Sequence, residues 1–182
     1  MIKKKINKNT LAIFLTHAMG YVGLSNKLLN LIKNKKIYLL EDVCESHGAK
    51  LGTKKAGTFG LMSNFSFYYG HHMTTIEGGM ISTNSKEIDR LAKMKRGHGL
   101  LRDSQDKNFI KKKMQKYKDL NNDFIFDTEG FNLRNTELAA VLGIEQLKRL
   151  NHNIKKRNDN HKLYLKLLRG DIFFKDFNLK GS

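Results

Sequence analysis

The first apolar run of the chain covers residues 11–15 and lies between polar neighbours. A short, continuous apolar run of this length is typical of a buried strand. A second such run, residues 37–40, delivers Glu41 and Asp42 at its carboxyl end. Between the two runs, Ser25 is placed to cap a helix with an apolar face. That face consists of Leu28, Leu29, Leu31 and Ile32. Strand, helix and strand in this order predict a βαβ unit.

Two further strands are predicted after the glycine-rich connection 48–60, at residues 64–68 and 80–83. After these strands, Ser85 is placed to cap a helix. Its apolar positions are Ile88, Leu91, Ala92 and Met94. The polar and basic stretch 100–123 predicts an excursion from the core that is partly helical.

The clearest amphipathic helix opens at Asn135 or Thr136 and continues through a basic segment to Arg157. Its apolar positions recur at helical spacing. They are Leu138, Val141, Leu142, Ile144, Leu147 and Leu150. Strands that alternate with helices in this way predict an α/β fold.

Composition changes this picture little. The chain has 182 residues, 40% of them apolar, which is enough for one globular domain with a core. The formal net charge of +17 raises nucleic acid as a partner. The lysines are dispersed, however, with short clusters only at residues 3–5 and 111–113. Because charge alone defines neither a fold nor a site, we expect no specific nucleic-acid partner.

Cys44 is the only cysteine, so one chain can build neither a disulfide framework nor a multi-cysteine metal site. A reducing cytoplasm fits this usage. No apolar run approaches the length of a membrane span. The lysines at residues 3–5 before the run 11–15 suggest a signal peptide, but Thr16 and His17 end that run too early. We therefore expect a cytoplasmic protein with no membrane partner and no metal.

Taken singly, the candidate functional residues are weak indicators. An aspartate at a strand end is usually a turn or cap residue, and two adjacent histidines are more often structural than catalytic. Their ordered combination is more specific, and it spans residues 10–168. The motifs are Glu41-Asp42-Val43-Cys44-Glu45-Ser46-His47-Gly48-Ala49, Gly57-Thr58-Phe59-Gly60, Phe65-Ser66-Phe67, His71-His72, Glu77-Gly78-Gly79-Met80-Ile81-Ser82-Thr83, Gly97-His98-Gly99 and Gly130-Phe131-Asn132-Leu133-Arg134. This series resembles the DegT/DnrJ/StrS family of sugar aminotransferases and dehydratases.

The resemblance implies the fold. It predicts a partial, truncated large domain of a fold-type I PLP-dependent transferase, in which helices flank a mixed sheet. Members of the family are longer than this chain, so we expect a fragment. Residues 1–150 would form part of the cofactor-binding large domain. Residues 151–182 would form a helix leading towards a mostly missing small domain. The complete protein is expected to be a homodimer.

The resemblance also implies a pyridoxal 5'-phosphate or pyridoxamine 5'-phosphate cofactor and the residues that bind it. A carboxylate that keeps the pyridine nitrogen protonated deepens the cofactor's electron sink, and Asp42 matches this residue. Ser66 matches a hydroxyl donor to the cofactor phosphate. Asn132 matches a residue that reaches a phosphate across a dimer interface, and Glu45 matches a residue beside the ring. For Glu45 and Asn132, a local turn or surface contact stays an open alternative.

His71 stands where aminotransferase members of the family carry a lysine, counted from Gly79. That lysine forms the Schiff base that holds the cofactor, whereas imidazole forms no stable one but acts as a base near neutral pH. Histidine at this position distinguishes the family's sugar 3-dehydratases. In these enzymes free pyridoxamine phosphate condenses with the 4-keto group of a nucleotide-linked 6-deoxy sugar. The histidine moves a proton and the 3-hydroxyl leaves, so the resemblance implies that His71 is catalytic.

Two kinds of such dehydratase exist, and only one carries an iron–sulfur cluster. A cluster requires several cysteines, so the single Cys44 favours the cluster-free kind, which acts on GDP-4-keto-6-deoxymannose. The implied partners are a nucleotide sugar and glutamate as amine donor, in a pathway such as lipopolysaccharide biosynthesis. Two alternatives stay open. One is an inactive sugar aminotransferase homologue, and the other is a basic polyanion-binding protein that reuses the scaffold.

Overall fold

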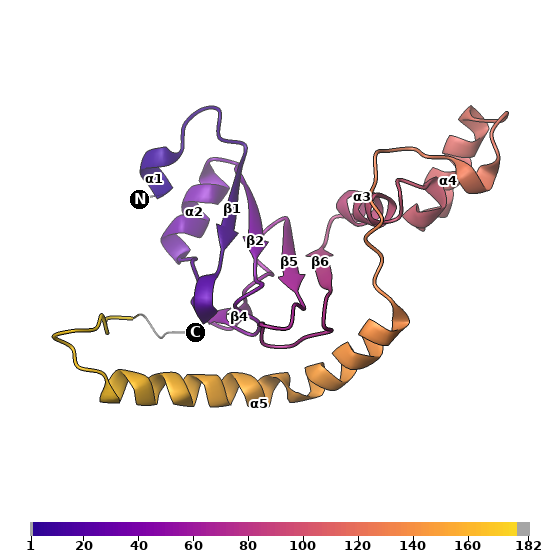
Figure 1. The fold of residues 1–182 in the computed structure, drawn as a ribbon. Helices are drawn as coiled ribbons and strands as arrows, with labels where there is room; N and C mark the ends of the chain where they lie inside the picture. The colour runs from indigo at the N-terminus through magenta and orange to yellow at the C-terminus, as the bar shows by residue number, and fades with distance from the viewer. Residues whose placement is uncertain (1, 178–182) are drawn as a thin grey trace. The chain divides into compact units, whose positions relative to one another are not determined.

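The computed structural model describes residues 2–177 and contains a four-stranded sheet in the order β1-β2-β5-β6 (Figure 1). The strands are β1 (Ala12–Thr16), β2 (Tyr38–Asp42), β5 (Met62–Ser66) and β6 (Gly79–Thr83). Strands β1, β2 and β5 are parallel, while β6 runs in the opposite direction. The sheet is therefore mixed, which confirms the predicted fold class.

Helix α2 (Asn26–Asn34) connects β1 to β2 and completes the predicted βαβ unit. The Ser25 hydroxyl accepts a hydrogen bond from the Leu28 amide at 3.2 Å, as its capping role requires. The strand bounds differ slightly from the prediction. Glu41 and Asp42 lie within β2, and β5 begins and ends two residues earlier than predicted. Pairing decides these bounds, because the backbone of Met62 aligns with that of Leu40.

One face of the sheet is covered at β1 and β2 and the other is open, while the residues of β6 are exposed or half-buried on both faces. On the covered face, β1 and β2 pack against α2 and the segment that precedes it. The buried residues of this core are Leu24, Ile32, Ile37 and Leu39. On the open face, Phe14 is 62% exposed and Tyr38 is 51% exposed. The apolar runs thus form real strands, but only one of their faces is buried within the described chain.

The connection between β2 and β5 forms a second, smaller core beneath the sheet. Its buried members are Val43, Ala49 and Ala56. It includes a short antiparallel hairpin of β3 (Lys50–Leu51) and β4 (Lys54–Lys55). Two short elements complete the amino-terminal part, helix α1 (Ile2–Lys5) and the 3-10 turn η1 (Ala18–Gly20).

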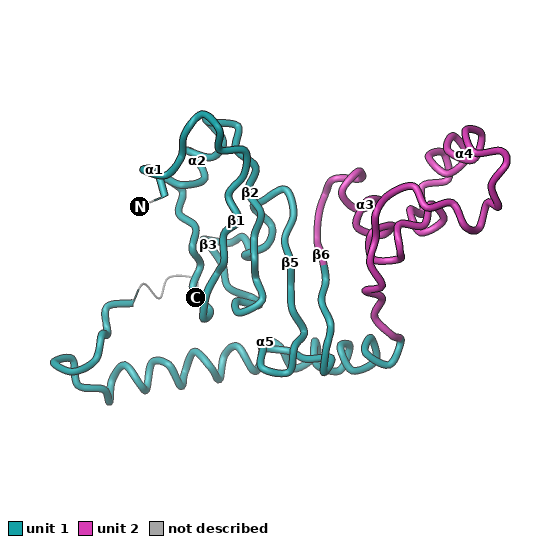
Figure 2. The backbone as a smooth tube through the Cα atoms, turned by 45° about the horizontal axis from the view of Figure 1, so that its top comes forward, with its two compact units in different colours: residues 1–80, 137–182 teal, residues 81–136 magenta. Residues whose placement is uncertain are grey.

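The chain divides into two compact units, residues 1–80 with 137–182 and residues 81–136 (Figure 2). The second unit contains α3 (Lys86–Arg96), η2 (Leu101–Ser104), α4 (Lys107–Lys116) and η3 (Asn122–Phe124). Ser85 caps α3 by accepting from the Ile88 amide at 3.3 Å. Helix α4 and the turns η2 and η3 confirm that the polar stretch 100–123 is partly helical. A domain division near residue 150 stays a prediction.

The Gly97-His98-Gly99 motif has a structural explanation inside the second unit. Gly99 has φ +83°, and a Cβ atom there would lie 1.8 Å from the Thr128 carbonyl oxygen. Only glycine permits both the backbone conformation and this close approach. The adjacent His98 amide donates to the Phe131 carbonyl at 2.8 Å. The motif therefore joins the end of α3 to the segment near residue 130.

Helix α5 (Glu137–Leu167) confirms the predicted long helix and belongs to the first unit. It contacts the loops at the carboxyl ends of the strands. The Ile154 side chain packs on Gly48, and Tyr21 Oη lies 2.8 Å from His161 Nε2. Most of its predicted apolar stripe is exposed. The exposed members include Leu138, Val141, Leu142, Ile144 and Leu147.

Candidate functional site

Asp42 lies in a row of three polar residues on adjacent parallel strands. It aligns with Thr16 of β1 and with Asn64 of β5. Asp42 Oδ1 accepts hydrogen bonds from Asn64 Nδ2 and from the Cys44 amide, each at 3.1 Å. Asp42 Oδ2 accepts from Thr16 Oγ1 at 3.4 Å. The open sheet face thus presents a carboxylate near the carboxyl ends of the strands, which is where α/β sheets bind ligands.

The Asp42 carboxylate is ionised but has no cationic partner. Partial burial by itself would raise the pKa of Asp42. Hydrogen bonds from Cys44, Asn64 and Thr16 outweigh this effect and hold that pKa below its ordinary value. Among residues 2–177, no lysine, arginine or histidine forms an ion pair with Asp42. Neutral donors alone support this charge, so the site is suited to a cationic ligand group.

Glu41, the preceding residue, faces the covered side of the sheet and is fully buried. Its Oε2 atom accepts from the Gly57 amide at 2.8 Å, and Oε1 accepts from the Phe59 and Gly60 amides at 2.7 Å each. Burial opposes ionisation, but the hydrogen bonds from His17 and these amides lower the pKa of Glu41. The Gly57-Thr58-Phe59-Gly60 motif is therefore a loop that folds around a structural carboxylate.

His17 completes this buried arrangement. Its Nδ1 atom accepts from the Gly23 amide at 3.1 Å, so the proton of the neutral ring is on Nε2. His17 Nε2 then donates to Glu41 Oε2, also at 3.1 Å. Sequence reasoning used His17 only as the end of an apolar run and missed this role. No sequence signal identifies it, because the pairing depends on the tertiary position of residue 17.

Ser66 and Asp42 belong to one contact cluster through Cys44. The Cys44 thiol accepts from Asn64 Nδ2 at 3.2 Å and also contacts the backbone of Ser66. Burial, and then the nearby Asp42 carboxylate, raise the pKa of Cys44 to about 11, so it stays a neutral thiol. The structure thus brings together two of the residues assigned to the cofactor, Asp42 and Ser66. Their proposed roles stay predictions.

Glu45 makes a local contact. Its Oε2 atom accepts from the Met19 amide at 2.8 Å, and the neighbouring Ser46 hydroxyl accepts from the Gly20 amide at 3.1 Å. Both side chains therefore hold the turn η1 against the segment that follows β2. This contact is the local alternative left open for Glu45, and its placement beside a cofactor ring stays a prediction.

His71 lies in the turn that follows β5, with its amide donating to the Tyr68 carbonyl at 3.1 Å. Its ring centroid lies 5.8 Å from that of Tyr68 and 6.4 Å from that of His47. His47 also lies 5.6 Å from His72. His71 is half-buried and therefore accessible, as a proton-transfer role would require. That role stays a prediction.

His47 is buried, His72 is half-buried like His71, and both His47 and His72 are uncharged at neutral pH. Burial lowers the pKa of each to about 4, and repulsion by neighbouring cationic groups adds to this effect. Neither ring nitrogen of His47 has a hydrogen-bond partner within the described residues. His47 sits against Phe65 and Phe67 of the β5 segment. His47 therefore packs between these phenylalanine rings and the turn that contains His71. The sequence motif alone did not reveal this position.

Asn132 lies in the second unit. It forms an isolated antiparallel bridge with Gly97, and its side chain is exposed. The nearby Arg134 guanidinium lies 3.8 Å from Asp103. The assignment of Asn132 to a phosphate across a dimer interface stays a prediction.

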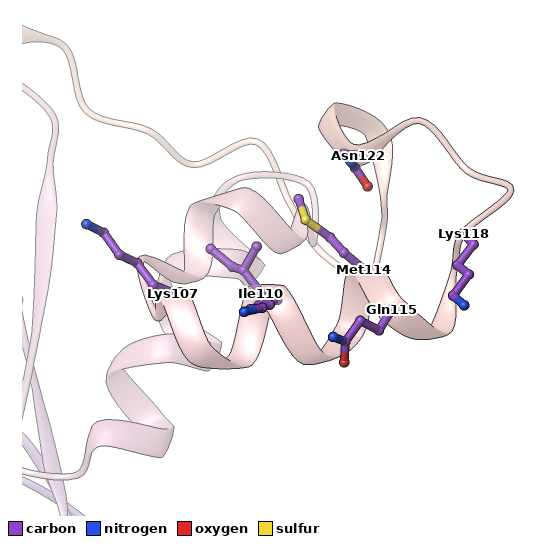
Figure 3. Close-up of a pocket in the computed structure, with 7 residues that line it drawn as sticks. Lys107, Ile110, Met114, Gln115, Lys118 and Asn122 are labelled. Carbon is purple, nitrogen blue, oxygen red and sulfur yellow. The ribbon is translucent and has the colours of Figure 1, made fainter.

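A surface pocket on α4 is a weaker candidate (Figure 3). It is lined by Lys107, Ile110, Lys111, Met114, Gln115, Lys118 and Asn122. The side chains of Lys107 and Lys118 lie at opposite ends of the pocket, and their ammonium groups do not converge on one point. A phosphate site needs converging donors. The pocket is therefore a basic part of the surface and not a specific anion-binding site.

Residues 2–177 contain neither a cluster of metal ligands nor a helix able to span a membrane. No cluster of three or more His, Cys, Asp or Glu side chains is arranged to hold a metal ion. No helix in the described chain has the length and apolar character needed to cross a membrane.

Residues 1–174 match the DegT/DnrJ/EryC1/StrS aminotransferase family, and the chain belongs to this family. A curated relative, the GDP-4-keto-6-deoxy-D-mannose 3-dehydratase of Escherichia coli O55:H7, is 37% identical over 164 residues. The match covers 90% of this chain and 42% of that protein. The chain therefore spans less than half the length of this curated relative.

Two solved structures show the same fold. One is a variant of the GDP-4-keto-6-deoxymannose-3-dehydratase ColD with bound GDP-perosamine, with 36% identity and a TM-score of 0.81. The match covers 91% of this chain and 42% of that one. The other is a GDP-4-keto-6-deoxymannose-3-dehydratase with trapped PLP and glutamate, with 32% identity and a TM-score of 0.75. This match covers 97% of this chain and 44% of that structure's chain.

Proposed function

We propose that this chain is the part of a pyridoxamine-phosphate-dependent sugar dehydratase that holds the cofactor ring and supplies the base. The substrate would be a nucleotide-linked 4-keto-6-deoxy sugar, which loses its 3-hydroxyl. The observation that carries the proposal is the ionised Asp42 carboxylate on an open sheet face, supported only by neutral donors. A protonated pyridine nitrogen is a cation, and it would supply the ion-pair partner that the Asp42 carboxylate lacks.

The residues present fit such a cofactor. Asp42 would hold the proton on the ring nitrogen, and Ser66, which contacts the same Cys44, would donate its hydroxyl to the phosphate. When bound, the cofactor supplies the amine and the electron sink. Cys44 is neutral and so does not compete with the ring nitrogen for Asp42. Glu41 and His17 position the loop beneath the sheet and take no part in the chemistry.

His71 would move the proton. Its imidazole lies in the turn after Ser66 and is half-buried, beside the uncharged His47. Imidazole takes up and returns a proton near neutral pH, which suits a base that must act more than once per turnover. Lysine in this position would instead bind the cofactor covalently. The histidine therefore favours dehydration over amine transfer to the sugar.

The similarity to GDP-sugar 3-dehydratases supports a GDP-linked substrate, and the relative with trapped glutamate supports glutamate as the amine donor. We include a homodimer and a cytoplasmic location in the proposal. In such an assembly Asn132 would reach a phosphate of the neighbouring subunit, and Glu45 would lie beside the ring.

The test is to incubate the whole protein that contains this segment with pyridoxamine phosphate, glutamate and GDP-4-keto-6-deoxymannose. We expect loss of the 3-hydroxyl, detected by mass spectrometry of the sugar nucleotide. Stable transfer of an amine to carbon 4 with retention of the 3-hydroxyl would show an aminotransferase instead. Absence of any cofactor binding would reject the proposal.

A further inference from the structure

We infer that Asn64 and Thr16 are positioning residues, which hold the Asp42 carboxylate in a fixed orientation towards a cationic ligand. The identity of that ligand, a protonated pyridine ring, rests on the proposed function. The positioning itself rests on contacts within the chain.

Backbone pairing places Thr16, Asp42 and Asn64 in one row across the sheet. Thr16 aligns with Asp42, and Asp42 aligns with Asn64, across three parallel strands. Neighbouring strands lie about 4.8 Å apart, so aligned side chains on one face are within reach of one another. Thr16 and Asn64 therefore flank the carboxylate from both sides, on elements that the β-ladder holds in place.

The two oxygens of Asp42 have different hydrogen-bond partners. Oδ1 receives two donors, Asn64 Nδ2 and the Cys44 amide, both at 3.1 Å. Oδ2 receives the hydroxyl of Thr16, at 3.4 Å. The Cys44 thiol is a further hydrogen-bond donor to the carboxylate. These donors come from three strands or strand ends, so they hold the carboxylate against rotation.

The orientation of the Asn64 amide follows from its two acceptors. Nδ2 donates to Asp42 Oδ1 at 3.1 Å and to the Cys44 thiol at 3.2 Å. The flipped amide would place its oxygen against the carboxylate and would repel it. Asn64 is thus held by both contacts and in turn restricts rotation of the Asp42 side chain.

The neutrality of the row matters as much as its geometry. The groups that face Asp42 are a hydroxyl, an amide, a thiol and a backbone N–H, and none of them is charged. An arginine or lysine in the row would also stabilise the carboxylate, but it would occupy the place of the cationic ligand. Neutral hydrogen-bond donors keep the Asp42 carboxylate ionised but do not neutralise its negative charge, which stays available to a cation.

The first experiment needs no cofactor. The carboxyl carbon shift of Asp42 is followed by NMR against pH in the whole protein that contains this segment, without added cofactor, with Asn64→Ala, Thr16→Val and Thr16→Ser as variants. We expect the titration midpoint of Asp42 to rise in Asn64→Ala, to rise less in Thr16→Val, and to return in Thr16→Ser. Asn151→Ala, an exposed change on α5, is the matched control and should leave the midpoint unchanged.

The second experiment measures binding of pyridoxamine phosphate to the whole protein by its absorbance. Losing one hydrogen bond to a charged group should weaken binding by about 10-fold in Asn64→Ala. If wild type does not bind the cofactor, the proposed function fails while the NMR titration still tests the positioning. If Asn64→Ala does not fold, Asn64→Ser, which keeps a donor, is used in both experiments and should give an intermediate shift. An unchanged Asp42 midpoint in both the Asn64 and the Thr16→Val variants would overturn the inference.

Discussion

Glu41 and Asp42 are adjacent in β2, yet their carboxylates lie on opposite faces of the sheet and have different partners. Glu41 is fully buried and receives three backbone amides and His17. Asp42 lies on the open face and receives only neutral side chains and the Cys44 amide. The alternation of a strand thus separates a structural carboxylate from the one that we propose binds the ligand.

Glu41 should be essential for stability. Glu41→Ala leaves one buried donor, His17 Nε2, and three part-buried backbone amides without an acceptor. An orphaned buried donor costs about 1–3 kcal/mol. We therefore expect a loss of at least about 3 kcal/mol in the free energy of unfolding, measured by urea titration. Glu145→Ala is the control, because Glu145 forms only an exposed pair with Lys148 and should change stability by less than about 0.5 kcal/mol. Equal effects of the two variants would contradict the structural role of Glu41.

His47 should make stability depend on pH. Its pKa in the folded chain is about 4, below the ordinary value of 6.5, so between these values the unfolded chain binds the proton more readily. The stabilisation is complete above pH 6.5 and is lost as the pH falls towards 4. His47→Leu should therefore lose less stability than wild type when urea unfolding is compared near neutral pH and at about pH 5. His152→Leu, an exposed change, should behave as wild type.

The open sheet face should make the isolated chain self-associate. Phe14 and Leu15 are adjacent in β1, but Phe14 is 62% exposed whereas Leu15 packs against the α2 core. Phe14→Lys should shift sedimentation towards monomer without loss of folded signal, since it removes exposed apolar surface. Leu15→Lys should unfold the chain, because it places a charge in the core. A wild-type chain that sediments as a monodisperse monomer and melts cooperatively would contradict this expectation.

His71 should decide how the whole protein holds its cofactor. Wild type should release pyridoxal phosphate after borohydride reduction, whereas His71→Lys should retain it covalently, because only lysine supplies an amine. Mass spectrometry of the denatured protein measures the difference. Covalent cofactor on the wild-type protein at His71 would exclude the proposed role.

His71→Asn should separate binding from chemistry. Cofactor affinity should stay close to that of wild type, since Asp42 and Ser66 are unchanged. The rate of 3-hydroxyl loss should fall on the order of 10²–10⁴-fold, because the proton-transfer step loses its base. A variant that retains the wild-type rate would assign the base to another residue.

The sequence by itself determined the βαβ unit, the Ser25 and Ser85 caps, the long helix α5 and the family. These features depend on local periodicity, on capping chemistry and on motifs in a fixed order, all of which are visible along the chain. The motif also drew attention to Asp42, Ser66 and His71. The family resemblance singled out Asp42 rather than Glu41, but the apolar run that both carboxylates follow gives no physical reason for that choice.

Only the tertiary structure decided what surrounds these residues. The parallel register places Thr16 and Asn64 on either side of Asp42, and folding of the 43–60 connection brings Gly57 to Glu41. His17 and His47 acquire their roles in the same way, through neighbours that are distant in sequence. Such contacts depend on which strands pair and in what register, and a pattern read along a single chain does not contain that information.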